Sequence, residues 1–418
     1  MSVSPLKSAA SSAGDLAPPA MLPGMVVLIL ALCLGLQPVT TDLYLPALPA
    51  LSEGLQATVS KTQLTLSALL LSFGISQLIW GPLSDRFGRR PIMLAGLLVY
   101  TLAAAGGATA TSIEMLVLWR ALQGAAMGAG VMCARAIIRD LYAPESGARV
   151  MSKALSGLGV MACLSPPIGG LLAETMGWRS ALLAPALVGA MVLAVVFWRF
   201  EETVAVKNPH ALQFGALGRN WLAIMRHPSF IAYTLLGMAS YCVLFTMLAS
   251  SPFVFIKIMG MSKALCGLAM FSVAFAYLCG TFLCRRWLPR YGVRKTLLRA
   301  GALSLIGGTL LGGLALAGVL SPWAILLPVY LVVLAHGVHQ PCSQSGAVGP
   351  FPRAAGAASA LSGFVMMLGA FGMGAWLGAH NDGTVFALTN GMWFWTVVIA
   401  LICWTLVQKH GDPSAKAA

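Results

Sequence analysis

The feature that most constrains this chain is a regular alternation of long apolar runs with short polar connectors, which begins at Met21. Each run has roughly 20 residues, the length that a helix needs to cross the hydrocarbon core of a bilayer. The chain is 58% hydrophobic and only 9% charged, whereas about 25% of a soluble domain is charged. Lipid is therefore the expected solvent for most of the surface. We predict twelve spans, at residues 22–50, 62–80, 92–110, 114–136, 150–172, 180–200, 230–255, 264–284, 296–318, 322–345, 355–379 and 385–407.

The chain also contains an internal repeat. Residues 290–294 have the spacing of residues 86–90, and the tetrapeptide at Ala154 recurs at Ala360 with nearly the same offset. Two such matches predict two similar halves, so we expect an all-α membrane protein with two pseudo-symmetric six-helix bundles. The expected parts are a flexible cytoplasmic tail, a first bundle, a cytoplasmic linker, a second bundle and a short cytoplasmic tail, at residues 1–20, 21–200, 201–228, 229–408 and 409–418.

The positive charges predict the orientation in the membrane. Lys and Arg gather in the even-numbered connectors and near the termini, whereas the odd-numbered connectors carry only Lys61, Arg179, Lys257 and Lys263. By the positive-inside rule both termini are expected in the cytoplasm. The net charge is +14, but it is scattered over loops, which argues against a nucleic-acid-binding face. Cysteines stand singly in apolar runs, so we expect no metal site, disulfide or cofactor.

The most highly charged connector is the segment 81–91. Gly88 permits a tight turn, and the neighbouring arginines suit the anionic inner surface of a membrane. The segment resembles the signature loop of the major facilitator superfamily, and the resemblance extends from about Met21 to Gln408. It implies a conformational latch between helix ends of the two bundles; the alternative is a topology anchor alone. The residues concerned are Gly81, Asp85, Arg86, Gly88, Arg89 and Arg90.

Three further segments carry the resemblance. Residues 41–49 are similar to the first span of the Bcr/CflA branch of twelve-span drug:proton antiporters, and residues 120–124 resemble the fourth-span motif of the family. Residues 165–170 resemble a fifth-span motif associated with exporters, although a serine replaces the usual first glycine. We expect this motif to form a kinked, closely packed helix where the halves meet. Its residues are Ser165, Pro166, Pro167, Gly169 and Gly170.

Asp42 is the strongest functional candidate, because it alone among the 12 acidic residues lies well inside an apolar run. A charged Asp at the centre of a span costs about 2.5–3.5 kcal/mol on insertion scales, so proton uptake is favoured there. Pro38 and Pro46 flank it at helical spacing and predict an irregular, water-accessible backbone. We predict a proton carrier; the alternative is a structural Asp. Related antiporters often carry a second acid where this chain has Leu34, so one proton per cycle is the simplest expectation.

Arg120 is the one cation deep within a span, and Gln123 lies one turn further on. The resemblance implies that Arg120 communicates with the protonation site, and a static pair between helices is the alternative. Tyr241 and Phe245 belong to a helical stripe that lines a pocket or packs between helices. For two histidines one turn apart three roles are open: they titrate, they ligate a cation, or they only pack against neighbouring helices. The candidate substrate-binding residues are Thr41, Leu45, Gln123, Tyr241, Phe245, His336 and His339.

The sequence therefore predicts a secondary active transporter that exports drug-like amphiphilic compounds in exchange for protons by alternating access. The expected setting is the bacterial inner membrane, with the protein as a monomer whose partners are a small molecule, protons and the bilayer. A proton-coupled carrier of a metabolite such as an amino acid, peptide or sugar is the alternative. A channel would need a ring of repeated polar loops, and an enzyme would need a nucleophile–base pair, metal ligands or a nucleotide loop. The chain shows neither.

Overall fold

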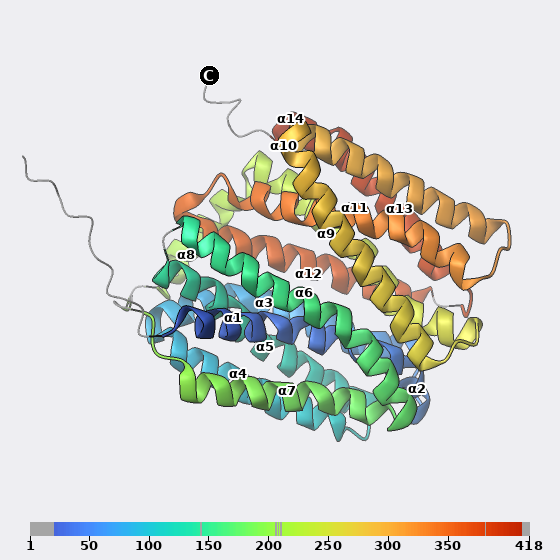
Figure 1. Ribbon diagram of the computed structural model, residues 1–418, viewed down its shortest axis with the longest axis horizontal. Helices are drawn as coiled ribbons and strands as arrows, with labels where there is room; N and C mark the ends of the chain where they lie inside the picture. Colours follow the sequence, from blue (N-terminus) through green and yellow to red (C-terminus); the bar gives the residue numbers. More distant parts are fainter. Residues whose placement is uncertain are drawn as a thin grey trace, which may run out of the picture.

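The computed structural model describes residues 21–142, 144–204, 207, 209, 211–380 and 382–411. These residues form helices joined by short turns, and there is no strand among them (Figure 1). The predicted tail at 1–20 lies outside the described residues, as does the second tail from residue 412 onward. That second tail was expected to begin at Lys409, but Lys409 and His410 are helical.

The N-terminal half of the chain, residues 21–200, is a series of long helices with two short helical segments after the first. Its elements are α1 (Pro23–Thr41), η1 (Leu45–Ala47), α2 (Leu48–Gly54), α3 (Val59–Phe87), α4 (Arg89–Ala108), α5 (Ile113–Leu141), α6 (Pro144–Thr175) and α7 (Trp178–Arg199). The first predicted span is therefore not one continuous helix, because α1 ends just before Asp42. The irregular backbone predicted around Asp42 is confirmed.

The remainder of the chain repeats this pattern. Its elements are α8 (Phe214–Met225), α9 (Pro228–Pro252), the π-helix η2 (Phe253–Ile258), α10 (Lys263–Leu316), α11 (Pro322–Val348), η3 (Pro352–Ala354), α12 (Ala355–Ala379), α13 (Phe386–Trp404) and α14 (Leu406–His410). The sequence did not predict α8, which lies within the segment expected to be a polar linker. It forms because Trp221 and Ile224 share one helical face, and Ile224 is almost completely buried.

Eleven helical segments of the described residues are long and apolar enough to cross a membrane. One of them, α10, has 54 residues, which would make a rod of roughly 80 Å at about 1.5 Å per residue. Gly292 interrupts it with φ 68° and ψ 172°, outside the helical region. The segment is therefore two helices that meet at Gly292, as the separate spans predicted at 264–284 and 296–318 require.

Helices of the same half pack mainly on one another, and most of the contact between the halves comes from α3 with α12 and from α6 with α10. Small residues allow the close approach. A Cβ atom at Gly267 of α10 would lie 2.5 Å from the Pro166 carbonyl oxygen of α6.

Along the antiparallel pair α3 and α12 the close contacts form a ladder over most of the two helices. Glycine faces a larger side chain at each step, on one helix or the other. The steps pair Ser60 with Gly378, Ser67 with Gly374, Gly74 with Met367, and Gln77 with Gly363.

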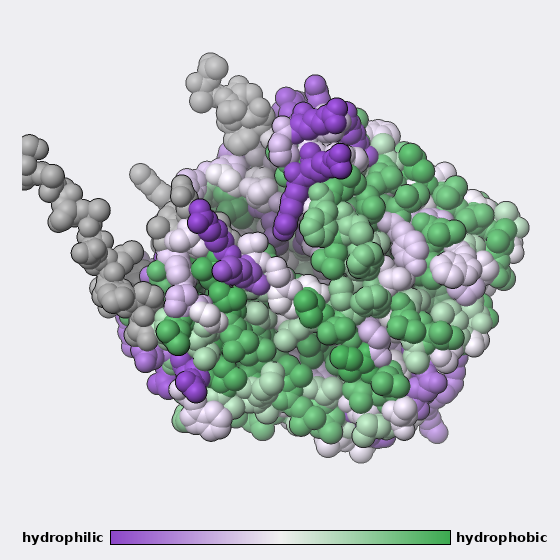
Figure 2. All heavy atoms as spheres, viewed as in Figure 1, coloured by the Kyte–Doolittle hydropathy of each residue, from purple (hydrophilic) through white to green (hydrophobic). Residues whose placement is uncertain are grey.

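The surface agrees with a membrane location. Figure 2 shows a broad hydrophobic belt across the middle of the molecule, with hydrophilic side chains gathered toward the ends of the helices. Large apolar side chains such as Leu118, Trp198 and Leu316 are 70–80% exposed, which in water would be unfavourable. We call the end that carries Asp85–Arg90 the arginine-rich end, and the end that carries α2 and η2 the opposite end.

Candidate functional site

Asp42 lies in the turn between α1 and η1, where the proline-containing end of the helix leaves the regular backbone pattern. Its amide donates to the Pro38 carbonyl at 2.8 Å, and the Thr41 hydroxyl donates to its Oδ1 at 2.6 Å. The residue is only partly accessible. No basic side chain of the described chain forms an ion pair with it. The carboxyl group therefore has one neutral hydrogen-bond donor and no compensating cation.

Arg120 of α5 contacts residues on both sides of that turn. Its side chain is almost fully buried, and one Nη donates to the carbonyl of Thr40 at 3.0 Å. The guanidinium lies over the Tyr44 ring at 3.9 Å from the centroid, and its other Nη donates to Gln123 at 2.8 Å. The partners of this buried cation are thus a carbonyl, an amide and an aromatic face, rather than an acid. They hold residues 40 and 44, which bracket Asp42.

The fifth-span motif supports the same turn from α6. A Cβ atom at Gly169 would collide with the Leu43 carbonyl, which shows how closely α6 approaches the residue after Asp42. One residue further on, Gly170 lies against the backbone of Lys263 at the start of α10. The Ser165 hydroxyl donates to the carbonyl of its own helix at Met161, 2.7 Å away. The motif thus connects the Asp42 turn with the C-terminal half.

A small cavity of about 90 Å³ lies between the halves, nearer the arginine-rich end. Polar side chains from both halves line it, including Gln37, Arg135, Gln340 and Gln344, together with Tyr241. Asp42 does not line it, but Gln37 does, about one turn before Asp42 on α1. This cavity is therefore adjacent to the protonation candidate.

The other substrate-binding candidates do not line that cavity. Thr41, Leu45, Gln123 and Phe245 are at most 7% exposed, and the lining residues do not include them. His336 and His339 of α11 lie together and share the Ser240 hydroxyl of α9, at 2.7 and 3.4 Å from their Nδ1 atoms. No group of three metal-ligating side chains occurs among the residues described. Of the seven candidates, Tyr241 alone reaches this cavity.

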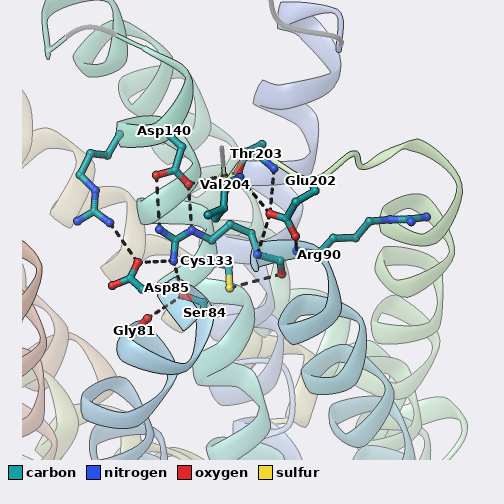
Figure 3. Close-up of polar contacts among 11 residues, drawn as sticks. Gly81, Ser84, Asp85, Arg90, Cys133, Asp140, Glu202, Thr203 and Val204 are labelled. Atoms are coloured by element: carbon teal, nitrogen blue, oxygen red, sulfur yellow. Dashed lines mark hydrogen bonds and ion pairs between the residues drawn. The ribbon is translucent and has the colours of Figure 1, made fainter. Parts of the chain in front are cut away.

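The arginine-rich turn is a compact charge cluster centred on Arg89 (Figure 3). Arg89 is 3% exposed, and its guanidinium bonds Asp85 at 2.6 Å and Asp140 at 2.9 Å. It also donates to the Ser84 hydroxyl at 2.6 Å, and Arg139 approaches Asp85 at 3.5 Å. These groups come from α3, α4 and α5, so the cluster lies within the N-terminal half in this structure. The predicted latch residues therefore do not join the halves here. A hydrogen bond between the halves lies one turn before Arg139 on α5, where Arg135 donates to Ser359 at 3.2 Å.

A third carboxylate, Glu202, caps the start of α4. It accepts from the amides of Arg89 at 2.9 Å and Arg90 at 3.1 Å, as Figure 3 shows. Gly88 has φ 108°, and any Cβ there would collide with the Glu202 carboxylate. Desolvation raises the pKa of Glu202, but hydrogen bonds from four backbone amides outweigh it, so the pKa lies below the usual glutamate value. Arg90 adds a bond to the Phe197 carbonyl at 2.9 Å, whereas Arg86 only stacks on its neighbour's ring.

The sequence did not single out Asp140 or Glu202. The sequence did contain a signal for them, because both are acidic residues in connectors that otherwise carry mainly Lys and Arg. In a chain with only 12 acidic residues, each such carboxylate needs a local cation or a helix N-terminus as a partner.

Comparison with known proteins identifies the family. The family model described as Major Facilitator Superfamily matches residues 30–374. The chain belongs to this superfamily. It is therefore a multi-pass membrane transporter and not an enzyme, and the resemblance drawn from the motifs is confirmed.

The relatives include resistance proteins. Multidrug resistance protein D of Escherichia coli is 28% identical over 93% of this chain and 98% of its own length. A chloramphenicol resistance protein of Pseudomonas aeruginosa is 31% identical over 77% of this chain and 75% of its own length. Among solved structures, a D-xylose-proton symporter superposes with a TM-score of 0.73 at 18% identity, covering 92% of this chain and 97% of the symporter. That likeness shows the superfamily fold.

Proposed function

We propose that this member of the superfamily exports drug-like amphiphilic compounds in exchange for protons. The observation that carries the proposal is Asp42, a carboxyl group without a compensating cation, in a broken helix whose preceding turn carries Gln37 into a cavity between the halves. The resistance activities named for the relatives favour a drug over a metabolite as cargo. In the proposed architecture twelve spans form two six-helix bundles, with α10 contributing two spans.

The proposed orientation follows from charge. Arg86, Arg89, Arg90, Arg290 and Arg294 belong to even-numbered connectors between spans, and the positive-inside rule assigns these connectors to the cytoplasm of a bacterial inner membrane. Both termini then lie in the cytoplasm. The cavity lined by Tyr241 lies nearer the cytoplasmic end, and the opposite end is assigned to the exterior.

The proposed coupling uses the contacts of the turn. An ionised Asp42 needs water or donors, whereas a neutral one does not, so each protonation state favours a different arrangement of the turn. Arg120 holds the flanking backbone, so the adjustment is directed toward Leu43 and the α6 glycine packed on it. Because α6 packs on α10, the two states of Asp42 bias how the halves meet. Proton entry is thereby linked to exposure of the cavity on alternate sides.

The test is Asp42→Asn, which preserves size and removes the titration. We expect it to abolish substrate-driven proton flux in proteoliposomes, read with an internal pH dye, and to abolish resistance to chloramphenicol and an unrelated antibiotic in cells. Glu114→Gln is the control, because Glu114 is an exposed carboxylate paired with Lys61, and it should behave as wild type. Normal proton flux in correctly folded Asp42→Asn protein contradicts the proposal. Proton-coupled uptake of a single nutrient would favour the metabolite carrier.

A further inference from the structure

A larger cavity, of about 370 Å³, lies at the opposite end of the molecule. Gln63 near the first turn of α3 lines it, whereas Asp85 is in the last turn of that helix. Apolar side chains form most of its wall, among them Val59, Phe253 and Leu377. Neither Asp42 nor Tyr241 lines it. It is thus separate from the cavity beside the protonation candidate, and its size is within the range of small-molecule sites.

Two buried polar atoms of the lining residues have no hydrogen-bond partner. They are Oε1 of Gln63 on α3 and Oγ of Ser250 on α9, one from each half. Their side chains are 1% and 6% exposed. A buried polar atom without a partner bears the full cost of desolvation, so such atoms indicate a missing ligand or water. The amide oxygen accepts hydrogen bonds only, and it therefore requires a donor.

An ion pair between the halves lies in the wall of this cavity. Lys257 of η2 bonds Glu53 of α2, and both residues line the cavity. Their side chains are 46% and 66% exposed, so the pair faces solvent on its outer side. Because the two charges satisfy each other, neither is left to bind an ionic group inside. The site therefore suits an uncharged molecule.

We propose that this cavity is a second small-molecule site, which binds a neutral amphiphile through an apolar body and a hydrogen-bond-donating hydroxyl or amide group. A ligand there contacts both halves at once. Binding therefore favours the conformation in which the opposite end is closed, and it opposes release of cargo on that side. This role in transport rests on the proposed function, whereas the binding itself does not.

Chloramphenicol is a suitable probe, because it is neutral and carries hydroxyl and amide donors on an aromatic body. Its binding to the purified full-length chain in lipid nanodiscs is measured by equilibrium dialysis. We expect Gln63→Met and Ser250→Ala each to weaken one binding site about five- to tenfold, and Ala387→Phe to abolish that site by filling the cavity. Ser304→Ala is the matched control, since Ser304 has a buried hydroxyl without a partner and lines neither cavity.

Two outcomes overturn the site: no saturable chloramphenicol binding to wild type, or wild-type binding by Gln63→Met, Ser250→Ala and Ala387→Phe alike.

Closure of the opposite end is measured with a variant that carries Glu53→Cys together with Lys257→Cys. Chloramphenicol should raise its crosslinking yield, and an unchanged or lower yield overturns the closure. Failure of the proposed function looks different: Asp42→Asn would then transport normally while the Gln63→Met binding defect persists.

Discussion

The two halves contain the same arginine-rich turn, but they use it differently. In the N-terminal half, Arg89 is buried between Asp85 and Asp140, and Glu202 caps the helix that follows. In the C-terminal half, valine occupies the position of Arg89, and Pro289 occupies that of Asp85. Described residues there form no ion pair with an acid.

The backbone is the part that both copies keep. Gly88 and Gly292 both have positive φ, at 108° and 68°. The cations of the second copy remain exposed, and Arg299 and Arg290 stack on the Tyr291 ring at 3.4 and 5.3 Å. The comparison teaches that glycine and its flanking arginines specify the turn and its side of the membrane. Only the added carboxylates make it a rigid cluster.

The largest expected difference in stability is between the variants Arg89→Met and Arg290→Met. Removing Arg89 leaves two carboxylates without their buried cation, which should lower the free energy of unfolding by about 3–5 kcal/mol. Arg290 is exposed, so its replacement should change stability by about 0.5 kcal/mol or less. Unfolding of both variants in mixed detergent micelles, followed by circular dichroism, measures this. Equal losses would show that the two turns are held in the same way.

A smaller difference is expected between the two glycines. Alanine at either position meets backbone strain of about 1–3 kcal/mol, but only at Gly88 does the added carbon also meet a neighbour, the Glu202 carboxylate. Gly88→Ala should therefore destabilise the protein by about 1 kcal/mol more than Gly292→Ala. The excess should shrink when Glu202→Ala is added to Gly88→Ala, as a double-mutant cycle would show. Additive effects of the two substitutions would contradict a collision between the added methyl group and the Glu202 carboxylate.

The smallest effect is expected from Glu202→Gln, at about 1 kcal/mol or less, because Glu202 is exposed and its charge is screened. The pKa of Glu202 is lowered in the folded protein. Its stabilisation is therefore complete above the unfolded-state pKa and is lost as the pH falls through the folded-state pKa. The wild type should exceed the variant in stability above about pH 5 and lose that advantage in stronger acid. A constant difference across this range would exclude the charged cap.

The sequence predicted the helices well, because a long apolar run has few alternatives in a bilayer. It also located Asp42, Arg120 and the signature turn, since a charge in an apolar run is conspicuous. It did not predict α8, whose 12 residues are too few and too mixed in polarity to resemble a span. Amphipathic spacing of Leu217, Trp221 and Ile224 was the available signal.

Contacts between helices were the part that the sequence could not supply. The partners of Arg120 depend on how α5 is rotated against α1, and no sequence spacing encodes that rotation. For the same reason the histidines of α11 were grouped with the cavity, whereas they meet Ser240 inside the C-terminal half. Asp140 and Glu202 come from segments far from Arg89 in the chain, so only the fold brings these three side chains together.

The glycine ladder between α3 and α12 limits how the molecule can move. Each pair along these helices places a glycine against a larger side chain, from Ser60 and Gly378 to Gln77 and Gly363. A lengthwise shift of one helix along the other would move each glycine away from the side chain that it accommodates. Rotation of the two helices about their line of contact keeps each of these pairs together. The contact between α3 and α12 thus resists sliding of one half along the other and leaves rotation about the line of contact as the low-cost motion between the halves.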